Sequence, residues 1–549
     1  MKHFFLLPAL FVSALSLTSC AQSQPAPPNA TAINWIPMPL VSPESLKMPG
    51  VTIGGEGGQW PRAAPQVSSA DPNFLLLPID VGGLYRSTDG GKMWRQSTAG
   101  WNARGANAFA FDPKNVNRLI GVGGNGADWD ITWGPSPHGL YISTDKALTW
   151  KQTLAVPDGR AGRIIIDATS YDAAKKFCTV AYYSSPSRGL FRSNDGGASW
   201  KGINRIAALE SDNPNGVSLI AMQPGKSTLY LAGKNGFYIS TDKGATFVKS
   251  TSGTRSANIT GLSVSKAQPD KVWISNLAGL SVSEDGGKTF KALPAKGITR
   301  DADSPIREVT VSPADANRVL VWVQNANYHW VRYISSDGGQ TFVPIKMQAG
   351  LQSRTDSGTQ VTSNALIPGG PTFLPFNTRN GYFSWHPTDA NIVYGIGGDW
   401  ITKSTDGGKT FLWSNNGFNG VMIGSSFNFD ATAPDKLFLA TQDNNGMFTT
   451  DGGKTWNYRD VSGKGWGGYL YGAGQVGNEV MWAGDADGCS SPRTLRISRD
   501  SGKTWKIATD AAGKNIVYGG RDVSGFVAHP ERRSRWNQSK TGRFENRHQ

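Results

Sequence analysis

Apolar and polar positions alternate over short stretches of this chain, and each stretch runs into a turn. Residues 83–87 read Gly-Leu-Tyr-Arg-Ser, a Thr-Asp-Gly-Gly turn follows, and Met93 and Trp94 open the next apolar stretch. Two such stretches around an Asp-Gly turn predict a β-hairpin. Helical spacing of apolar residues is nearly absent, so the pattern predicts an all-β protein.

A second pattern recurs between these hairpins. At residues 109–124, 311–323 and 385–398 an apolar stretch runs into a turn that contains proline and Asn or Asp, and another apolar stretch follows. Many short strands with even spacing are typical of a closed array of antiparallel sheets.

The hairpin turn itself is repeated nine times as Ser/Thr-x-Asp followed within five residues by Trp or Phe. The Asp side chain can accept hydrogen bonds from its own turn, and the aromatic residue can pack between sheets. A spacing of 43 to 69 residues suits one four-stranded sheet per repeat. The central aspartates are Asp89, Asp145, Asp195, Asp242, Asp285, Asp337, Asp406, Asp451 and Asp500.

These turns resemble the Asp-boxes of β-propellers. Proteins with such boxes include sialidases, the xyloglucanases of glycoside hydrolase family 74, sortilin-type receptors and photosystem-assembly factors. The resemblance covers about Val51 to Gly525. It implies a β-propeller in which the boxes lie on the face away from the active site, so the nine central aspartates are expected to be structural.

Three propeller architectures fit the repeats. We expect two tandem propellers divided near residue 365, covering 49–365 and 366–530, with the second one shortened. The division is placed there because 353–373 is a polar, Gly- and Pro-rich stretch. The alternatives are one ten-bladed ring, as in sortilin-like proteins, and a seven-bladed ring with a partial appendage.

The two ends of the chain differ from the repeats. Residues 1–19 read as a secretion signal, and Leu17 to Cys20 resembles a bacterial lipobox, in which Cys20 would carry lipid. We therefore expect a lipoprotein of the cell envelope, at the outer membrane of a Gram-negative host, with 20–48 as a tether; an ordinary cleaved signal is the alternative. The basic tail, 531–549, loses the repeat pattern, and we expect an incomplete or frame-altered end.

The composition limits the classes of ligand and binding partner that we expect. The net charge is +14, yet the basic residues are scattered and no arginine-aromatic motif of a nucleic-acid module is found. The three cysteines and six histidines form no metal-ligand spacing. We expect a polysaccharide substrate, a membrane contact only through the lipid anchor, no nucleic acid, no metal or other cofactor, and a monomer.

The most informative local segment is 80–86, Asp-Val-Gly-Gly-Leu-Tyr-Arg, which follows a Gly-rich run at 54–60. It resembles the Asp-Ile-Gly-Gly-Ala-Tyr-Arg segment of family 74 xyloglucanases, which implies that Asp80 is the general base. A comparison within the chain agrees with this role: the equivalent positions of the next four repeats hold Ser136, Pro186, Gly233 and Asn276, so only the first repeat has a carboxylate there. A turn-capping aspartate peculiar to the first repeat is the alternative.

The same resemblance implies a second carboxylate as general acid. Inverting hydrolysis needs a separation of roughly 6.5–9.5 Å between the two carboxyl groups. No second Asp-Ile-Gly-Gly segment is present, and Asp443 and then Asp399 are the best candidates, with Asp485 and Asp487 as rivals.

Aromatic side chains in irregular segments are candidates for stacking on sugar rings. With two polar neighbours they form the expected substrate-binding set: Trp60, Arg86, Trp129, Trp133, His138, Trp400 and Trp466.

Together these features predict a secreted, surface-anchored glycoside hydrolase that cuts a β-glucan or xyloglucan-like polysaccharide by inversion. A propeller-fold lyase acting on an acidic glycan is one alternative. A non-catalytic binding or assembly propeller is another, because fold alone does not separate these classes.

Overall fold

A computed structural model gives the structure of the chain. It describes residues 61–80, 83–103, 105–124, 138–155, 162–185, 189–204, 219–251, 257–325, 329–345, 382–396, 401–414, 418, 433–440, 446–455, 457–461, 470–484, 493–518, 527–528 and 536–537. The expected signal, the tether with Cys20, and nearly all of the basic tail lie outside these residues. No helix in the described part has the length and apolar character needed to cross a bilayer.

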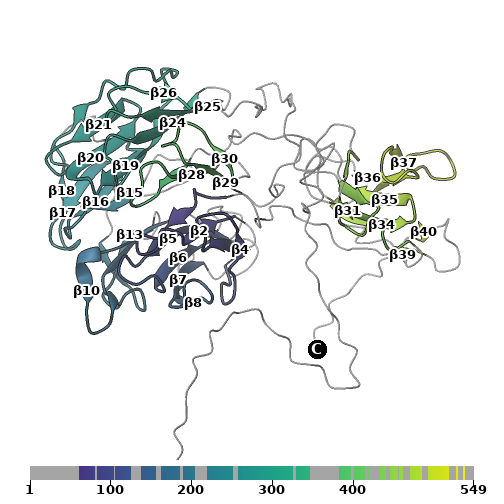
Figure 1. Ribbon diagram of the computed structural model, residues 1–549, viewed down its shortest axis with the longest axis horizontal. Coiled ribbons are helices and arrows are strands. Elements are labelled where there is room, and N and C mark those ends of the chain that lie inside the picture. Colours follow the sequence, from purple (N-terminus) through teal and green to yellow (C-terminus); the bar gives the residue numbers. More distant parts are fainter. Residues whose placement is uncertain are drawn as a thin grey trace, which may run out of the picture. The chain divides into compact units, whose positions relative to one another are not determined.

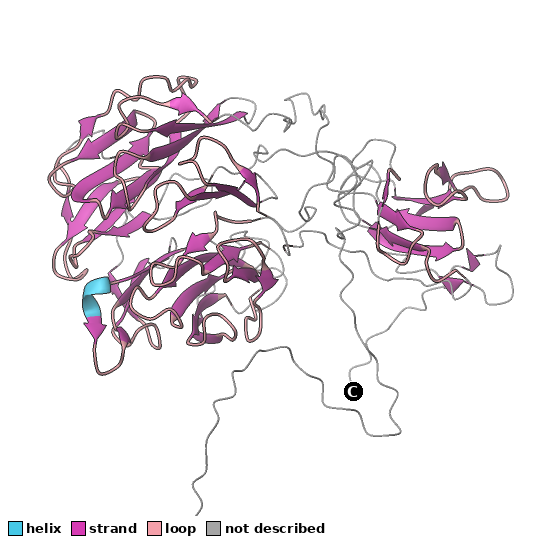
Figure 2. Ribbon diagram, viewed as in Figure 1, coloured by secondary structure: helices cyan, strands magenta, loops and turns pink. Residues whose placement is uncertain are grey.

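The regular secondary structure of the described residues consists almost entirely of strands (Figures 1 and 2), which confirms the predicted all-β class. The strands form successive antiparallel sheets, numbered here in chain order. Sheets 1 to 4 are β1 (Gln66–Val67), β2 (Leu75–Pro78), β3 (Leu84–Ser87) and β4 (Arg95–Gln96); β5 (Ala106–Phe111), β6 (Leu119–Gly123), β7 (Gly139–Ser143) and β8 (Lys151–Ala155); β9 (Arg163–Ile166), β12 (Ala181–Ser185), β13 (Gly189–Ser193) and β14 (Lys201–Asn204); and β15 (Leu219–Met222), β16 (Leu229–Gly233), β17 (Gly236–Ser240) and β18 (Val248–Lys249).

The later sheets follow the same order. Sheets 5 to 7 are β19 (Gly261–Ser265), β20 (Gln268–Asn276), β21 (Gly279–Ser283) and β22 (Lys291–Ala292); β23 (Ile306–Val311), β24 (Val319–Asn325), β25 (His329–Ser335) and β26 (Val343–Pro344); and β27 (Phe383–Trp385), β28 (Val393–Ile396), β29 (Ile401–Ser404) and β30 (Leu412–Trp413). Sheet 8 is β31 (Leu437–Ala440), β32 (Gly446–Thr449) and β33 (Asn457–Arg459), and sheet 9 is β34 (Leu470–Val476), β35 (Glu479–Gly484), β36 (Arg493–Ser498) and β37 (Lys506–Ile507), with β38 (Val517–Tyr518) paired to β36.

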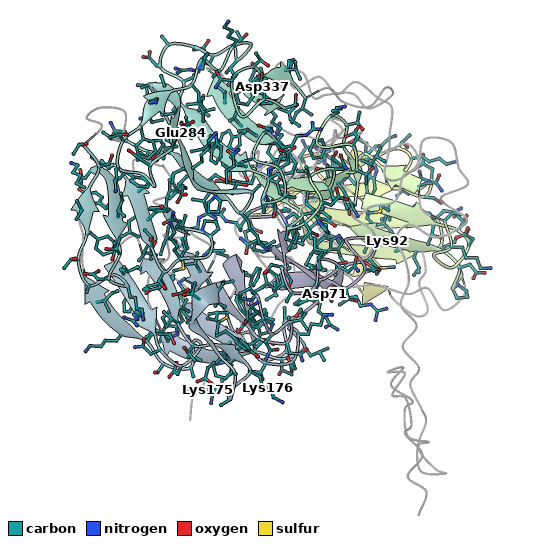
Figure 3. All side chains as sticks on the ribbon, turned by 60° about the vertical axis from the view of Figure 1, so that its left-hand side comes forward. Asp71, Lys92, Lys175, Lys176, Glu284 and Asp337 are labelled. Carbon is teal, nitrogen blue, oxygen red and sulfur yellow. The ribbon has the colours of Figure 1, made fainter. Side chains whose placement is uncertain are left out.

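Two small hairpins stand apart from this series. In sheet 3 the chain makes a 3-10 turn, η3 (Ala168–Ser170), and the hairpin β10 (Tyr171–Asp172) and β11 (Phe177–Cys178). Lys175 and Lys176, labelled in Figure 3, lie in the turn of this hairpin. A second pair, β39 (Val527–Ala528) and β40 (Trp536–Asn537), follows sheet 9.

In each described four-stranded sheet the repeated box forms the turn between the third and fourth strands, and in sheet 8 it forms the turn between β32 and β33. In sheet 4 the Ser240 hydroxyl donates to Asp242 Oδ1 at 2.7 Å, and the Gly244 amide donates to Ser240 Oγ at 2.8 Å. Thr246 donates its amide to Asp242 Oδ1 and its hydroxyl to Oδ2, at 2.9 and 2.5 Å. Both oxygens of the Asp242 carboxylate therefore accept hydrogen bonds within its own turn. Asp337, labelled in Figure 3, makes the equivalent bonds in sheet 6.

The antiparallel order fixes which connections share an edge of a sheet. The first-to-second and third-to-fourth connections lie at the same end of the strands, and we call this end of each sheet the box edge. The second-to-third connections lie at the opposite edge, together with the start of each first strand. Asp80, between β2 and β3, therefore lies at the edge opposite to the box of its own sheet.

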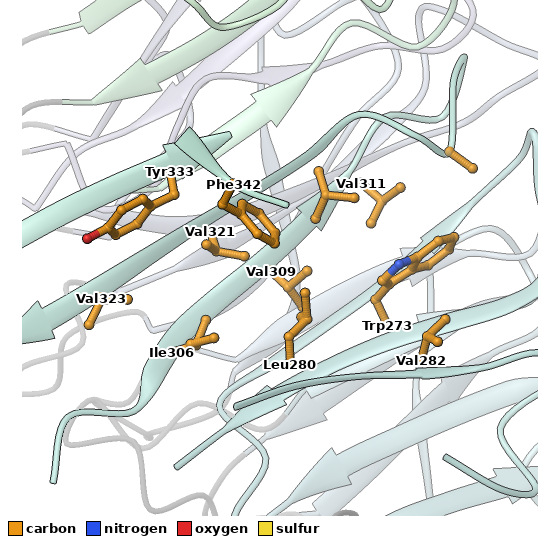
Figure 4. Packing of buried hydrophobic residues seen from close by; sticks show 12 residues of the cluster. Trp273, Leu280, Val282, Ile306, Val309, Val311, Val321, Val323, Tyr333 and Phe342 are labelled. Carbon is orange, nitrogen blue, oxygen red and sulfur yellow. The ribbon is translucent and has the colours of Figure 1, made fainter. Parts of the chain in front are cut away.

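Apolar side chains are buried between neighbouring sheets rather than within one sheet. The cluster between sheets 5 and 6 joins Trp273 and Leu280 to Val309 and Phe342 (Figure 4). Equivalent clusters join sheets 1 and 2, 2 and 3, 3 and 4, 4 and 5, and 6 and 7. Each of sheets 1 to 6 is thus stabilised by burial against the next one.

A further cluster joins the last of these sheets to the first. Leu75, Tyr85 and Trp94 of sheet 1 pack with Tyr394 and Ile401 of sheet 7. The contacts between sheets 1 and 7 therefore close a cycle of seven sheets. We propose that this cycle is a single seven-bladed unit.

Sheets 8 and 9 pack against each other through a separate cluster that includes Phe448 and Val480. The predicted division near residue 365 would separate sheet 7 from sheet 1, although the two share a buried cluster. We propose a division between Phe418 and Ala433 as an alternative to it. This grouping is closest to the alternative of a seven-bladed ring with a partial appendage.

Candidate functional site

Asp80 lies in a turn that packs tightly against the next sheet. It follows Ile79, the first residue after β2, and is half-buried. The Ala106 amide at the start of β5 donates to the Ile79 carbonyl at 2.8 Å. A Cβ atom on Gly105 would lie only 2.3 Å from the carbonyl oxygen of Asp80. The absence of a side chain at Gly105 therefore allows sheet 2 to approach the backbone that carries the carboxylate.

His138 lies at the same edge as Asp80. It is 2% exposed and directly precedes β7. Gly124, at the end of β6, donates its amide to the Gly105 carbonyl at 2.9 Å. A Cβ atom on Gly124 would lie 3.7 Å from the His138 ring and 3.2 Å from Asn107 Nδ2. Two close backbone approaches, at Gly105 and Gly124, thus connect the Asp80 turn to His138.

Arg86 lies near the opposite edge. Its Nη1 donates to the Lys146 carbonyl in the box of sheet 2, at 3.1 Å. Burial and the nearby charge of Arg95 lower the pKa of Arg86, against an opposing effect of Asp145. The side chain therefore links sheets 1 and 2, and the structure does not bring it to the Asp80 edge. Its expected contact with substrate stays a prediction.

Backbone carbonyl groups in several other boxes also accept hydrogen bonds from side chains of a neighbouring sheet. Arg118 of sheet 2 donates to the Gly196 carbonyl, and Tyr182 of sheet 3 donates to the Lys243 carbonyl. In sheet 7, Lys403 donates to the Gly90 carbonyl at 2.8 Å. The box edge is thus a recurrent site of contact between sheets.

The other predicted site residues lie outside the described part of the chain: Asp399, Asp443, Asp485, Asp487, Trp60, Trp129, Trp133, Trp400 and Trp466.

One ionisable group was missed by the sequence analysis. Glu308, the third residue of β23, accepts a hydrogen bond from Trp322 Nε1 at 3.0 Å. Burial raises the pKa of Glu308 to about 7, against the opposing effects of the Arg163 charge and the Trp322 hydrogen bond. A carboxyl group next to an arginine in a short apolar strand was the signal that could have identified it.

The comparisons with known proteins agree with the geometry. No family model matches the chain. Its sequence is similar to a xyloglucanase of Hypocrea jecorina, with 26% identity over 269 residues that cover 47% of this chain and 29% of that protein. It is also similar to an oligoxyloglucan-reducing end-specific xyloglucanase of Emericella nidulans, with 25% identity over 332 residues that cover 50% of this chain and 38% of that protein.

Among solved structures, the chain is similar to the family 74 xyloglucanase of Xanthomonas campestris, with a TM-score of 0.61, 16% identity, and 83% of this chain and 68% of that chain covered. The fold is that of a β-propeller. Each four-stranded sheet is a blade, and Asp80 belongs to the first blade. The matched residues span less than two fifths of the length of both curated xyloglucanases, so their activity is considered below only as a proposal.

Proposed function

We propose that this propeller is a glycoside hydrolase that cuts a β-glucan or xyloglucan-like backbone with inversion. The observation that carries the proposal is the position of Asp80. Its half-buried carboxylate lies at the edge opposite to the box, in a turn that is held against the second blade. The partial sequence similarity to xyloglucanases supports the same reaction and substrate class.

In this mechanism Asp80 removes a proton from a water molecule that attacks the anomeric carbon. A second carboxylic acid protonates the leaving glycosidic oxygen from the other side of the sugar. Asp443 is our first candidate for this acid and Asp399 our second. In the sequence, Asp399 follows β28 and Asp443 follows β31.

The cellular setting is part of the same proposal. Secretion followed by lipidation of Cys20 would hold the enzyme at the outside of a bacterial membrane. A polymeric substrate that does not cross membranes would be reached there. Cell fractionation of the full-length chain and of a Cys20→Ala variant would test this, and an unanchored wild-type protein would contradict it.

The direct test compares Asp80→Asn with the wild type on xyloglucan, mixed-linkage glucan and a panel of acidic glycans. We expect the wild type to release reducing ends from a neutral glucan. The variant should turn over at least about a hundredfold more slowly, with an unchanged Tm. NMR of the first product should show an inverted anomer. Asp89→Asn, in the box of the same blade, is the control: it should lower Tm and leave turnover nearly unchanged.

The outcome also separates the competing functions. Activity that is confined to acidic glycans and produces an unsaturated sugar would favour a lyase. A folded wild-type protein without activity on any of these substrates would favour a binding propeller.

A further inference from the structure

Three described first strands carry an extra residue at the same place: β5 and β23 in the cycle of seven sheets, and β34 in sheet 9, where the pairing shifts at Tyr471. In β5 the pairing with β6 shifts by one residue at Asn107, and in β23 the pairing with β24 shifts by one residue at Arg307. Beyond the shift, both pairings continue in the same register. In the other five blades of the cycle, the described pairing between the first and second strands shows no register shift near the start of the first strand. Such bulges redirect a side chain and are common beside active sites.

Both redirected residues of the cycle contain a polar atom without a partner. Asn107 Oδ1 and Arg307 Nε are buried side-chain atoms that make no hydrogen bond. Asn107 as a whole is only 5% exposed. Leaving a buried polar atom unpaired destabilises the folded state. A folded protein usually satisfies such atoms with water or a ligand. Five other described side chains also contain such an atom, and the two at the bulges are set apart by their position.

The bulges lie at the edge that holds Asp80. Asn107 follows by two residues Gly105, which packs against the Asp80 carbonyl. The bulge at Arg307 is the equivalent position of the sixth blade, and Glu308 follows it directly. The two positions therefore add an amide, a guanidinium and a carboxyl group to this edge of the propeller.

Sugar hydroxyl groups fit these side chains best. The amide and the carboxyl group accept hydrogen bonds from hydroxyls, and the guanidinium donates to them in a fixed plane. An acidic sugar fits less well, because Glu308, directly after Arg307, would while ionised oppose its carboxylate and offset the attraction of Arg307.

We propose that Asn107 and Arg307, with Glu308 next to Arg307 on β23, bind hydroxyl groups of a neutral glucan chain, directly or through one water molecule, as part of the Asp80 site. This inference rests on the proposed function. It adds substrate-binding residues that are separate from the catalytic pair and from the loop tryptophans.

The test measures oligosaccharide binding in the full chain with Asp80→Asn as the parent, so that no substrate is consumed. Cellotetraose, a xyloglucan oligosaccharide and, as the acidic ligand, an oligogalacturonide are titrated by calorimetry into the parent and into Asn107→Leu and Arg307→Gln derivatives. Leu matches Asn in size but lacks its polar atoms. We expect each derivative to bind about tenfold more weakly or worse. Asn107→Leu should also keep or raise Tm, which a structural hydrogen-bonding role would not allow.

Arg192→Gln is the matched control. Arg192 Nε is also buried without a partner, but the residue lies on β13, next to Ser193 and the box. Its substitution should leave binding unchanged. Binding by the parent that neither Asn107→Leu nor Arg307→Gln weakens, or equal weakening by Arg192→Gln, would overturn this inference and leave the hydrolase proposal standing. A parent that binds neither neutral oligosaccharide, or only an acidic one, would overturn both.

Discussion

Trp94 Nε1 donates a hydrogen bond to the Ser414 carbonyl at 2.6 Å, across 320 residues of chain. The Ser414 hydroxyl in turn donates to the Gly91 carbonyl at 2.6 Å. The contact between the first and second blades has the same form: Trp150 Nε1 donates to the Ser97 carbonyl at 3.0 Å, and the Ser97 hydroxyl donates to a carbonyl of the second box. The seventh blade thus contacts the first as the first contacts the second.

This repetition predicts where the chain can be cut. A chain that ends after residue 418 keeps all seven blades and the cluster around Trp94, so it should fold cooperatively and keep the Tm of the corresponding transition of the full chain. A chain that ends at residue 365 loses the seventh blade and exposes the buried faces of the first and sixth. We expect it to be insoluble or to unfold far more easily. Circular dichroism with thermal unfolding checks both chains.

Trp94→Phe in the shorter folded chain gives a finer measure of the closure. It removes the indole donor to Ser414 and should lower the free energy of unfolding by about 1 kcal/mol, from the lost hydrogen bond alone. Equal stability of the 365- and 418-residue chains would contradict the closed cycle and favour the division near residue 365.

Gly105 gives a prediction about the Asp80 turn. Gly105→Ala places a Cβ atom 2.3 Å from the Asp80 carbonyl oxygen, so the turn must shift. We expect a loss of about 1–3 kcal/mol in stability and a fall in turnover well beyond it. Gly202→Ala is the control, because its Cβ would meet only Phe191 at 3.9 Å. Kinetics and denaturant unfolding of both variants check the prediction. Equal turnover by both would show that the turn does not position a reacting group.

The fold class and the box turns could be predicted from sequence because they depend on local interactions. Each box joins residues within five or six positions of one another, as Ser240 and Thr246 are joined through Asp242. An alternating pattern next to such a turn leaves few choices other than a hairpin. The nine repeats then predicted a series of similar sheets.

The grouping of the blades and part of the candidate site could not be predicted in this way. The contact between Trp94 and Ser414 joins residues 320 positions apart, and no local pattern specifies that pair. A bulge changes the register of a strand without a distinct sequence signal, so Asn107 and Arg307 looked like ordinary strand residues. Arg86, by contrast, was chosen for its place in a motif, and it contacts a neighbouring box.

The boxes predict a distinctive loss of stability in acid. The hydrogen bond from the Thr246 hydroxyl, followed by that from its amide, lowers the pKa of Asp242 to about 2, from an ordinary value of 3.8. A carboxylate with a lowered pKa stabilises the fold above the unfolded pKa, and this contribution is lost as the pH falls towards 2. Asp242→Ala should therefore be less stable than the wild type at pH 5, and the difference should shrink between pH 4 and pH 2. Urea unfolding across this range measures it, and a gap that does not vary with pH would contradict the assignment.

For Glu308 we predict the opposite: stability should fall as the pH rises, and over a higher pH range than for the boxes. Burial raises its pKa to about 7 from an ordinary value of 4.5. Below pH 4.5 the group is protonated in both the folded and the unfolded chain, and the stability that it contributes is fully present. Between pH 4.5 and 7 the unfolded chain releases the proton first, so stability should fall as the pH rises, by at most about 3 kcal/mol.

Glu308→Gln removes this titration and can still accept the hydrogen bond from Trp322, so its stability should exceed that of the wild type by an increasing margin up to pH 7 and then level off. Arg163, on β9, is the charged group that acts on Glu308 from another blade, and Arg307 precedes it on its own strand. Arg163→Gln should raise the pKa of Glu308 further and extend the fall in stability to higher pH. Denaturant unfolding of the three proteins between pH 4 and pH 9 is the measurement. Parallel profiles for the wild type and Glu308→Gln would show that Glu308 titrates normally in the folded chain.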